Sequence, residues 1–348
     1  MYKSIIRPLL FLFPPEAAHA ITLKGLRIAR KVPGLRSLIK LIYCVKSPSL
    51  ERELFGIKFK NPVGIAGGLD KNGDHYNDFA NFGFSFIEIG SITPEPQGGN
   101  PRPRLFRLPK DNALINRMGI NNHGVQYAVD YLKKNHRKII VAGNLAKNAD
   151  TPNNLAYKDY ERTFSMLYDF VDFFVLNVSC PNVENLTALQ EIDTLSDIID
   201  RLINIRRFND DSKPILIKVS PDLTKEQLDG IIEISLLRGL EGIVATNTTN
   251  SRDRIVNTPK ADVEKIGRGG LSGAPLFETS LEFVKYIHEK SKGLLPIIAV
   301  GGITTPKQAQ QMLDAGASLI EVYTGFIYNG PAFAKNIIKY LQKNMLND

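Results

Sequence analysis

The chain contains 348 residues, of which 43% are hydrophobic and 23% are charged, so it is long enough for two small domains or for one large domain with an extension. Its two cysteines, Cys44 and Cys180, lie in dissimilar contexts, which argues against a disulfide framework or a metal cluster and favours a reducing compartment. The net charge of +8 resides in the first 50 residues, which carry nine bases and one acid, whereas the remainder carries 35 bases and 35 acids. This basic segment predicts an anionic partner, either lipid or nucleic acid.

The basic segment has the pattern of two short amphipathic helices. Apolar residues recur at helical spacing from Ala17 to Ile28 and, after the Pro33-Gly34 break, from Leu35 to Ile42, with bases between them. Such helices are typical of proteins that lie in a membrane interface. The other interpretation is a helical pair that only covers the body and keeps its charges in solvent. We predict that residues 1–48 form membrane-associating helices and that residues 49–348 form the catalytic body.

No part of this segment has the pattern of a spanning helix or a secretory signal. The apolar run from Pro8 to Pro15 is far shorter than the roughly 20 residues that cross a bilayer. The bases from Lys24 to Lys31 follow the Ala-His-Ala sequence that would be the cleavage site of a signal peptide. We therefore predict peripheral attachment to the cytoplasmic face of a bacterial inner membrane.

After residue 50 the chain alternates between apolar runs and amphipathic stretches. Because the runs are rich in β-branched residues and almost continuously hydrophobic, they are typical of parallel strands covered on both faces. Stretches such as Leu195 to Arg206 and Lys225 to Leu237 have helical periodicity. Eight strands predict an α/β fold, a (β/α)8 TIM barrel. The expected strands are Pro62 to Ala66, Phe84 to Gly90, Lys138 to Gly143, Phe173 to Val178, Pro214 to Val219, Gly242 to Thr246, Pro296 to Val300 and Ser318 to Tyr323.

The ends of the predicted strands favour the barrel over an open, doubly wound sheet. A Gly-x-Gly-x-x-Gly fingerprint, which would support the open sheet, is missing after the first strand. Nearly every strand ends instead in small or hydrogen-bonding residues, and barrel active sites are assembled at that face. Gly301-Gly302 and Tyr323 to Gly325 follow the last two strands, where barrels usually bind phosphate. Lys218 adds a positive charge in the barrel, which suits a cofactor that becomes anionic on reduction.

The segment from Asn177 to Asn182 has the composition of a reaction centre. It places the Cys180 thiol between two carboxamides at a strand exit, as an enzyme needs when it removes a carbon-bound proton beside a planar, hydrogen-bonding substrate. A buried small residue followed by an ordinary turn is an equally good interpretation of this segment taken alone.

Eight motifs together resemble the dihydroorotate dehydrogenases of the quinone-dependent class, over essentially the whole chain. Each motif is weak by itself, but their order and spacing are specific. They are Ala66-Gly-Gly-Leu-Asp-Lys71-Asn-Gly, Asn116-Arg-Met-Gly119, Asn177-x-Ser-Cys-Pro-Asn182, Ile217-Lys-Val-Ser-Pro221, Ala245-Thr-Asn-Thr-Thr249, Gly269-Gly-Leu-Ser-Gly273, Val300-Gly-Gly-Ile303 and Tyr323-Thr-Gly-Phe326.

The resemblance implies oxidation of dihydroorotate to orotate in UMP biosynthesis, with a hydride passing to flavin mononucleotide (FMN), and it implies no metal. Cys180 would take the C5 proton of the substrate. The implied FMN contacts are Gly67, Gly68, Leu69, Asp70, Lys71, Ser91, Asn144, Asn177, Lys218, Thr246, Gly273, Gly302, Tyr323 and Thr324. The implied substrate contacts are Lys71, Asn116, Arg117, Met118, Gly119, Ile120, Asn177, Asn182, Asn247 and Thr248.

Two departures from the quinone-dependent pattern bear on the mechanism. That class usually has Ser as the base, whereas Cys180 resembles the soluble classes that use fumarate or NAD. The residues after Asn182 are Val-Glu-Asn-Leu, where Thr-Pro-Gly-Leu is usual in a segment that resembles the lid of the site. The basic apolar extension has no evident use in a soluble enzyme, so we expect ubiquinone or menaquinone as the acceptor and no obligatory protein partner.

Two other classes of protein remain as alternatives. A flavin barrel acting on nucleic acid, such as a tRNA-dihydrouridine synthase, would also use a cysteine and a basic surface. Its bases should be interleaved with aromatic residues, whereas here they lie on leucine-rich helices, so we expect no nucleic-acid partner. A non-catalytic, membrane-associated barrel would not bind FMN.

Overall fold

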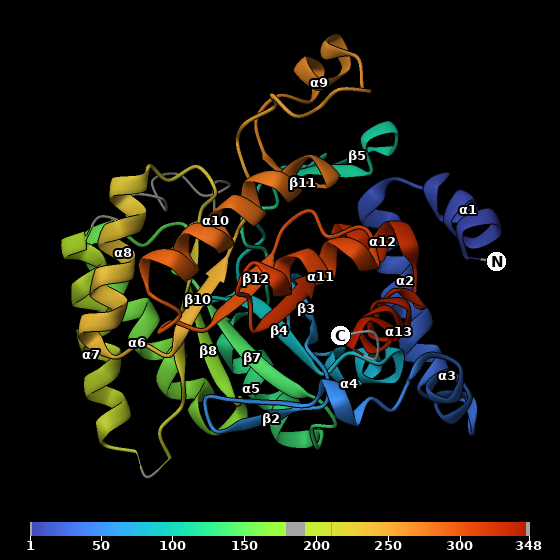
Figure 1. The fold of residues 1–348 in the computed structure, drawn as a ribbon. Coiled ribbons are helices and arrows are strands. Elements are labelled where there is room, and N and C mark those ends of the chain that lie inside the picture. Colours follow the sequence, from blue (N-terminus) through green and yellow to red (C-terminus); the bar gives the residue numbers. More distant parts are fainter. Residues whose placement is uncertain (1, 179–191, 210, 346–348) are drawn as a thin grey trace.

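The computed structural model describes residues 2–178, 192–209 and 211–345. Its centre is a closed barrel of eight parallel strands, in the order β10-β12-β13-β3-β4-β7-β8-β9 (Figure 1). All eight strands expected from the sequence are present, so the predicted TIM barrel is confirmed. The barrel strands are β3 (Val63–Asp70), β4 (Phe86–Ile92), β7 (Ile140–Leu145), β8 (Phe173–Asn177), β9 (Ile215–Val219), β10 (Gly242–Ala245), β12 (Ile297–Val300) and β13 (Leu319–Val322).

Helices surround the barrel because each strand buries one face against them. The amphipathic stretches predicted at Leu195 to Arg206 and Lys225 to Leu237 are confirmed as α7 and α8. A capping box at Thr224, whose side chain accepts from the Gln227 amide, defines the start of α8. The surrounding helices are α4 (Tyr76–Phe79), α5 (Gly124–Lys134), α6 (Ala156–Leu167), α7 (Ile192–Arg207), α8 (Lys225–Arg238), α10 (Phe277–Lys290), α11 (Pro306–Asp314), α12 (Thr324–Asn329) and α13 (Phe333–Met345).

A short hairpin of β1 (Arg52–Leu54) and β2 (Ile57–Phe59) packs against the apolar interior of the barrel. Phe59 lies edge-on to Phe86, with ring centroids 5.5 Å apart, and also contacts Phe173. Gly64 on β3 leaves the space for this packing, because a Cβ there would lie 2.3 Å from the Phe86 ring. Ligands must therefore enter from the opposite end, where the strands finish in polar residues.

Two segments far apart in the chain combine into a small antiparallel sheet that the sequence did not predict. β5 (Leu105–Leu108) and β6 (Ala113–Asn116) follow β4, whereas β11 (Gly270–Gly273) follows β10, and they pair in the order β11-β6-β5. The short helix α9 (Lys260–Ile266) projects from the body beyond this sheet (Figure 1).

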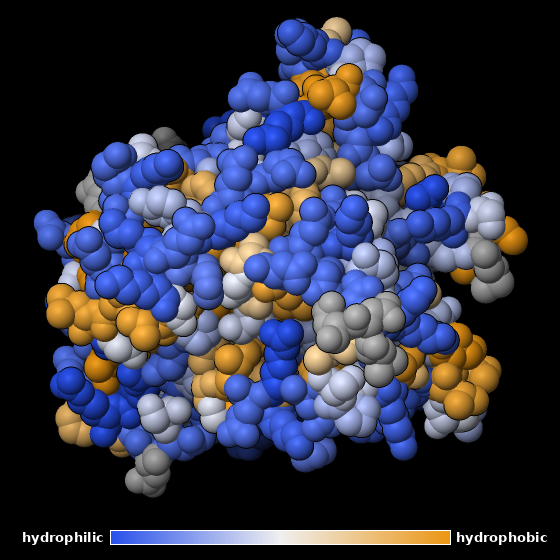
Figure 2. Space-filling view, in the orientation of Figure 1, coloured by the Kyte–Doolittle hydropathy of each residue, from blue (hydrophilic) through white to orange (hydrophobic). Residues whose placement is uncertain are grey.

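The N-terminal extension contains both predicted helices, α2 (Pro15–Ala29) and α3 (Leu35–Tyr43), preceded by a helical stretch that was not predicted. That stretch comprises a π-helical turn (Tyr2–Ile6) and α1 (Arg7–Phe11). Apolar side chains gather at the edge of the molecule formed by α1 and α3 (Figure 2). Leu12 and Leu41 are each 80% exposed there. Within the described part of the chain, no helix is both long enough and apolar enough to cross a bilayer.

Candidate active site

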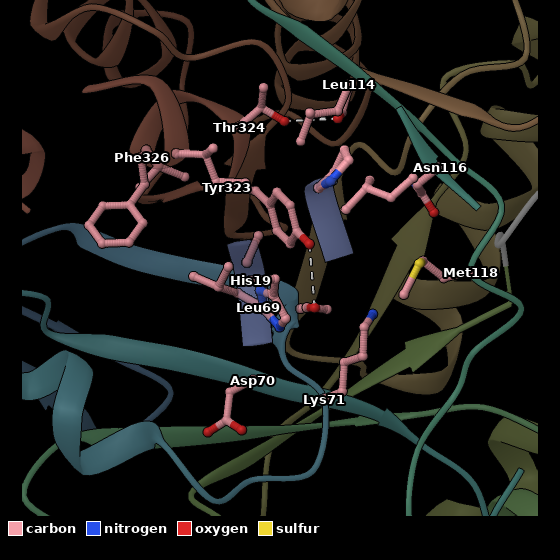
Figure 3. A pocket seen from close by; sticks show the side chains of 18 of the residues that line it. His19, Leu69, Asp70, Lys71, Leu114, Asn116, Met118, Tyr323, Thr324 and Phe326 are labelled. Carbon is pink, nitrogen blue, oxygen red and sulfur yellow. Dashed lines mark hydrogen bonds between the residues drawn. The ribbon is translucent and has the colours of Figure 1, made fainter. Parts of the chain in front are cut away.

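One cavity of about 630 Å³ lies at the carboxyl ends of the barrel strands. Its walls come from the strand ends, from β6 and β11, and from α2 of the extension (Figure 3). The volume is that of a typical small-molecule or cofactor site.

The structure gathers almost every described residue of the predicted site around this cavity. Arg117 is the exception, because its guanidinium donates to the carbonyls of Ile266 and Arg268 and lies over the Phe106 ring. Cys180 and Asn182 lie outside the described residues. The residues that line the cavity as predicted are Gly67, Gly68, Leu69, Asp70, Lys71, Ser91, Asn116, Met118, Gly119, Ile120, Asn144, Asn177, Lys218, Thr246, Asn247, Thr248, Gly273, Gly302, Tyr323 and Thr324.

The end of β3 forms one wall of the cavity. Lys71 points into the space that Asn116 and Met118 face from the other side, whereas the Asp70 carboxylate turns away from it (Figure 3). Asp70 accepts hydrogen bonds from the backbone amides of Asp74 and His75, at 3.0 and 2.8 Å. Complete burial, and next the charge of Asp74, raise the pKa of Asp70 to about 6. The Asp70 side chain therefore shapes the loop, and the Lys71 side chain is the one that faces the cavity.

A group of amide side chains forms a second polar wall. The Asn177 side chain donates to Ser91 Oγ at 2.7 Å, and the Asn247 side chain donates to Asn177 Oδ1 at 3.2 Å. The Asn247 side chain also accepts from the Thr248 amide, which fixes its orientation. Because carboxamides carry donors and acceptors in one plane, this wall suits a flat ligand with ring amides and carbonyls.

The ends of β12 and β13 form a third wall. Gly301 and Gly302 have φ of 124° and 71°, and a Cβ on either would come within 2.3 Å of Ser280 or Phe277, so only glycine fits this turn. The Tyr323 hydroxyl donates to the Gly68 carbonyl at 3.4 Å, and burial raises its pKa to about 12. Tyr323 is therefore a neutral donor at physiological pH.

The bottom of the cavity carries a charged group at the barrel axis. The Lys218 ammonium lies 2.8 Å from Glu88 Oε1, which also accepts from the Asn144 side chain at 2.5 Å. Gly67 lies directly above this carboxylate, because a Cβ on it would be 2.2 Å from Glu88 Oε1. A glycine at this position lets a ligand approach Lys218 and Asn144 closely.

The sequence did not predict that the extension also contributes to the cavity. His19 on α2 lines the cavity together with Leu69 and Tyr323, and all three are labelled in Figure 3. Burial, and next the charge of Lys71, lower the His19 pKa to about 4, so its imidazole is neutral. Arg104 donates to Glu16 Oε2 at 3.0 Å and closes the neighbouring wall. Periodicity placed His19 on a helix, but only the packing of α2 shows where its side chain points.

Comparison with known proteins assigns this chain to a family. The family model described as "Dihydroorotate dehydrogenase" matches residues 49–345. The chain belongs to the dihydroorotate dehydrogenase family. The family predicted from the motifs is therefore confirmed, and with it a flavin-dependent oxidation of dihydroorotate in pyrimidine biosynthesis.

Similar dihydroorotate dehydrogenases cover this chain almost completely. A protein of Christiangramia forsetii named "Dihydroorotate dehydrogenase (quinone)" is 49% identical over 99% of this chain and 100% of its own length. One of the same name from Coxiella burnetii is 43% identical over 98% and 97%. The ligand-free crystal structure of the Eimeria tenella dihydroorotate dehydrogenase superimposes with a TM-score of 0.86 at 34% identity, covering 96% of this chain and 95% of that one.

The residues of the cavity fit the flavin that this family uses. Asn144 Oδ1 is buried and accepts no hydrogen bond from any described residue, so it is an acceptor available to a ligand donor. Lys218 offers a cation in the same region, and the glycines at 67, 301 and 302 leave room for close approach.

Proposed function

We propose that this protein oxidises dihydroorotate to orotate with FMN and passes the electrons to a membrane quinone. One observation supports quinone as the acceptor: the extension and the barrel line the same cavity, because α2 forms part of the wall around the predicted flavin site. A soluble acceptor such as fumarate would give the extension no role in the site. An apolar quinone tail suits the wall formed by Ala18, Leu23 and Leu26.

FMN would be held by two walls of the cavity and by its bottom. Backbone at Gly67 and Gly68 would approach the ring, and Lys218 and Asn144 would meet its polar edge. Gly302, Tyr323 and Thr324 would hold its phosphate, at the strand ends where barrels commonly bind that group. When bound, FMN supplies the hydride acceptor, so the contribution of the protein is orientation and charge.

Dihydroorotate would lie between Lys71 and the amide wall. The Lys71 ammonium suits the substrate carboxylate, and Asn116, Asn177 and Asn247 suit the ring amides and carbonyls. The other predicted substrate contacts, Met118, Gly119, Ile120 and Thr248, line the same cavity and are part of the proposal. The proposal for Asn182, which lies outside the described residues, rests on its motif. Arg117 would hold the Asn116 to Ile120 segment in place, because its backbone amide donates to the Arg104 carbonyl and its carbonyl accepts from the Asn100 side chain.

Cys180 would be the base that takes the C5 proton. It follows Asn177 at the end of β8 by three residues, and its proposed role rests on that position in the chain. A free thiol ionises near pH 8.5, so a thiolate can hold the proton that a serine could accept only with more assistance.

Residues 1–48 would attach the protein to the cytoplasmic face of a bacterial inner membrane without a protein partner. The exposed apolar side chains of α1 and α3 would enter the interface, and nearby bases would meet anionic phosphates. Leu9, Leu38 and Leu41 are more than half exposed on these helices.

The choice of acceptor is tested anaerobically. Dihydroorotate should bleach the flavin of the detergent-solubilised protein, and a short-chain quinone should restore the colour rapidly, whereas fumarate and NAD should not. Restoration by fumarate at a comparable rate would move the protein to the soluble class. Failure of dihydroorotate to bleach bound flavin would contradict the substrate assignment.

The role of Cys180 is tested by the pH dependence of flavin reduction in single turnovers. The rate should rise with pH in a thiol-like range in the wild type, and Cys180→Ser should shift this rise to higher pH. Cys180→Ala should lose at least 100-fold, the lower range for a positioned general base. Cys44→Ser is the matched control, because Cys44 donates to the carbonyls of Ala80 and Asn81 outside the cavity. A flat wild-type profile would refute the assignment.

A further inference from the structure

Two buried carboxyl groups face a single ammonium at the bottom of the cavity. Glu88 on β4 and Glu321 on β13 are both completely buried, at 0% exposure. Lys218 Nζ on β9 lies 2.8 Å from Glu88 Oε1 and 3.9 Å from Glu321 Oε2. With both carboxyls ionised, this cluster would hold an uncompensated negative charge in the barrel interior, which is unfavourable where water cannot solvate it.

The hydrogen bonds distinguish the two carboxyl groups. Glu88 Oε1 accepts from Lys218 and from Asn144, as an ionised carboxylate should. Neither oxygen of Glu321 accepts a hydrogen bond from any described residue, and Glu88 Oε2 is also without a donor. A buried carboxylate without donors is unstable. A proton on one of the two carboxyls would let it donate a hydrogen bond to the other, which gives two of these three oxygens a partner.

The surroundings of Glu321 assign the proton to this residue. The neighbouring strands β12 and β3 place Val300 and Gly64 opposite it, so the charged groups that face it are Glu88 and Lys218. The pKa of Glu321 is raised, first by burial and next by the charge of Glu88. The charge of Lys218 lowers this pKa, but by a smaller amount.

We propose that Glu321 carries a proton and donates it in a hydrogen bond to Glu88, so that Glu321, Glu88 and Lys218 form a neutral cluster at the bottom of the cavity that would hold the flavin. Glu88 contributes −1, Lys218 contributes +1 and protonated Glu321 contributes nothing. Loss of the Glu321 proton would leave the cluster at −1 and oppose the negative charge that reduction places on the flavin. Glu321 is thus a positioning residue that keeps the charge of Lys218 available to the flavin. The inference rests on the proposed function only in requiring FMN in this cavity.

The proton is tested directly by infrared spectroscopy of the FMN-loaded enzyme. Protein labelled with ¹³C-glutamate should show the C=O stretch of a protonated carboxyl at pH 7, and this band should disappear in Glu321→Gln. Glu16→Gln is the matched control, because Glu16 is ion-paired with Arg104 on a different wall and should leave the band unchanged. Absence of a protonated-glutamate band from the wild type would overturn the inference without any variant.

The effect on the flavin is tested by its midpoint potential as a function of pH. Gln mimics protonated Glu, so Glu321→Gln should resemble the wild type at neutral pH. At alkaline pH, Glu321 of the oxidised wild type is ionised and takes up a proton when the flavin is reduced. The glutamine of the variant cannot do this, so two-electron reduction of the wild type should bind one more proton than reduction of the variant. The potential should then fall more steeply by about 30 mV for each tenfold change in proton concentration. Parallel curves at every pH would overturn the inference, whereas a protein that binds no flavin would contradict the proposed function instead.

Discussion

Arg30, the residue that directly follows α2, makes an extensive ionic contact between the extension and α4 of the body. Its Nε and Nη2 atoms donate to the two oxygens of Asp78, at 3.1 and 2.5 Å. Nη2 also donates to the Asp74 carbonyl at 3.0 Å, and Nη1 donates to the Tyr131 hydroxyl. The side chains of Arg30 and Asp78 are 24% and 5% exposed. Arg30→Met would preserve the apolar stem and leave a buried carboxylate without its main partner.

The expected cost lies between two measured limits. Removing one partner of a fully buried ion pair costs about 3–5 kcal/mol, whereas an exposed pair contributes about 0–1 kcal/mol. Because Arg30 is about one quarter exposed and His75 Nδ1 still contacts Asp78 at 2.9 Å, we expect about 2–3 kcal/mol. This corresponds to a roughly 30- to 150-fold increase in the population with α2 detached.

Amide hydrogen exchange in α2 measures this population. Exchange of the 15–29 segment should accelerate by the same factor, while strands β7 and β8 should be unaffected, because local opening does not require unfolding of the barrel. Quinone reduction should weaken, and reduction of flavin by dihydroorotate should be retained.

The destabilisation caused by Arg30→Met should depend on pH, because the Asp78 carboxyl must be ionised to pair with Arg30. Burial alone would raise its pKa, but hydrogen bonds from His75 and Arg30 and the charge of Arg30 outweigh burial and lower it. The contribution of ionised Asp78 to the stability of this contact is therefore complete above its unfolded pKa of about 3.9. It is lost as the pH falls through the lower pKa of the folded state. The difference between wild type and Arg30→Met should persist down to about pH 4 and shrink below it.

Lys24→Met is the matched control, because Lys24 is exposed on α2 and its removal changes the net charge equally. It should leave α2 exchange within about twofold, equivalent to less than about 0.5 kcal/mol. Equal acceleration in the two variants would show that net charge holds the extension, and unchanged exchange in Arg30→Met would refute the reasoning from this ion pair.

Two further predictions concern the cavity. Gly67→Ala should lower the FMN content, because its Cβ would lie 2.2 Å from Glu88 Oε1. Gly98→Ala is the control and should retain FMN, because its Cβ would meet no atom within 4 Å. Equal flavin-to-protein absorbance ratios in the two variants would contradict this expectation. His19 has a folded pKa of about 4, below its unfolded value of about 6.5, so its contribution to stability is complete above pH 6.5 and is lost as the pH falls toward 4. The wild type should therefore lose stability between pH 7 and pH 5, and His19→Gln should make this loss smaller by at most about 2 kcal/mol, because solvent in the cavity weakens the cost of burying the charged imidazole. Urea unfolding at both pH values measures the loss. An equal loss in the two proteins would show that His19 is not desolvated.

The sequence by itself determined the barrel and most of the cavity wall. Hydrophobic periodicity is a local property, and parallel strands of one barrel place their carboxyl ends at one face whatever connects them. Polar residues after the predicted strands, such as Lys71, Asn144 and Tyr323, could therefore be assigned to one site before the distances between them were known. The apolar runs also located the helices α2 and α3.

Only the tertiary structure decided which groups meet across the chain. β6 and β11 pair although Asn116 and Gly270 are remote in sequence, and α2 turns His19 into the cavity while Arg30 reaches Asp78. Glu88 and Glu321 each occur as a single acid within an apolar strand, a signal that marks each as unusual without showing that they face the same lysine. Side-chain period specifies which face of an element is buried, whereas the pairing of remote charges depends on barrel closure and helix packing, which no local pattern encodes.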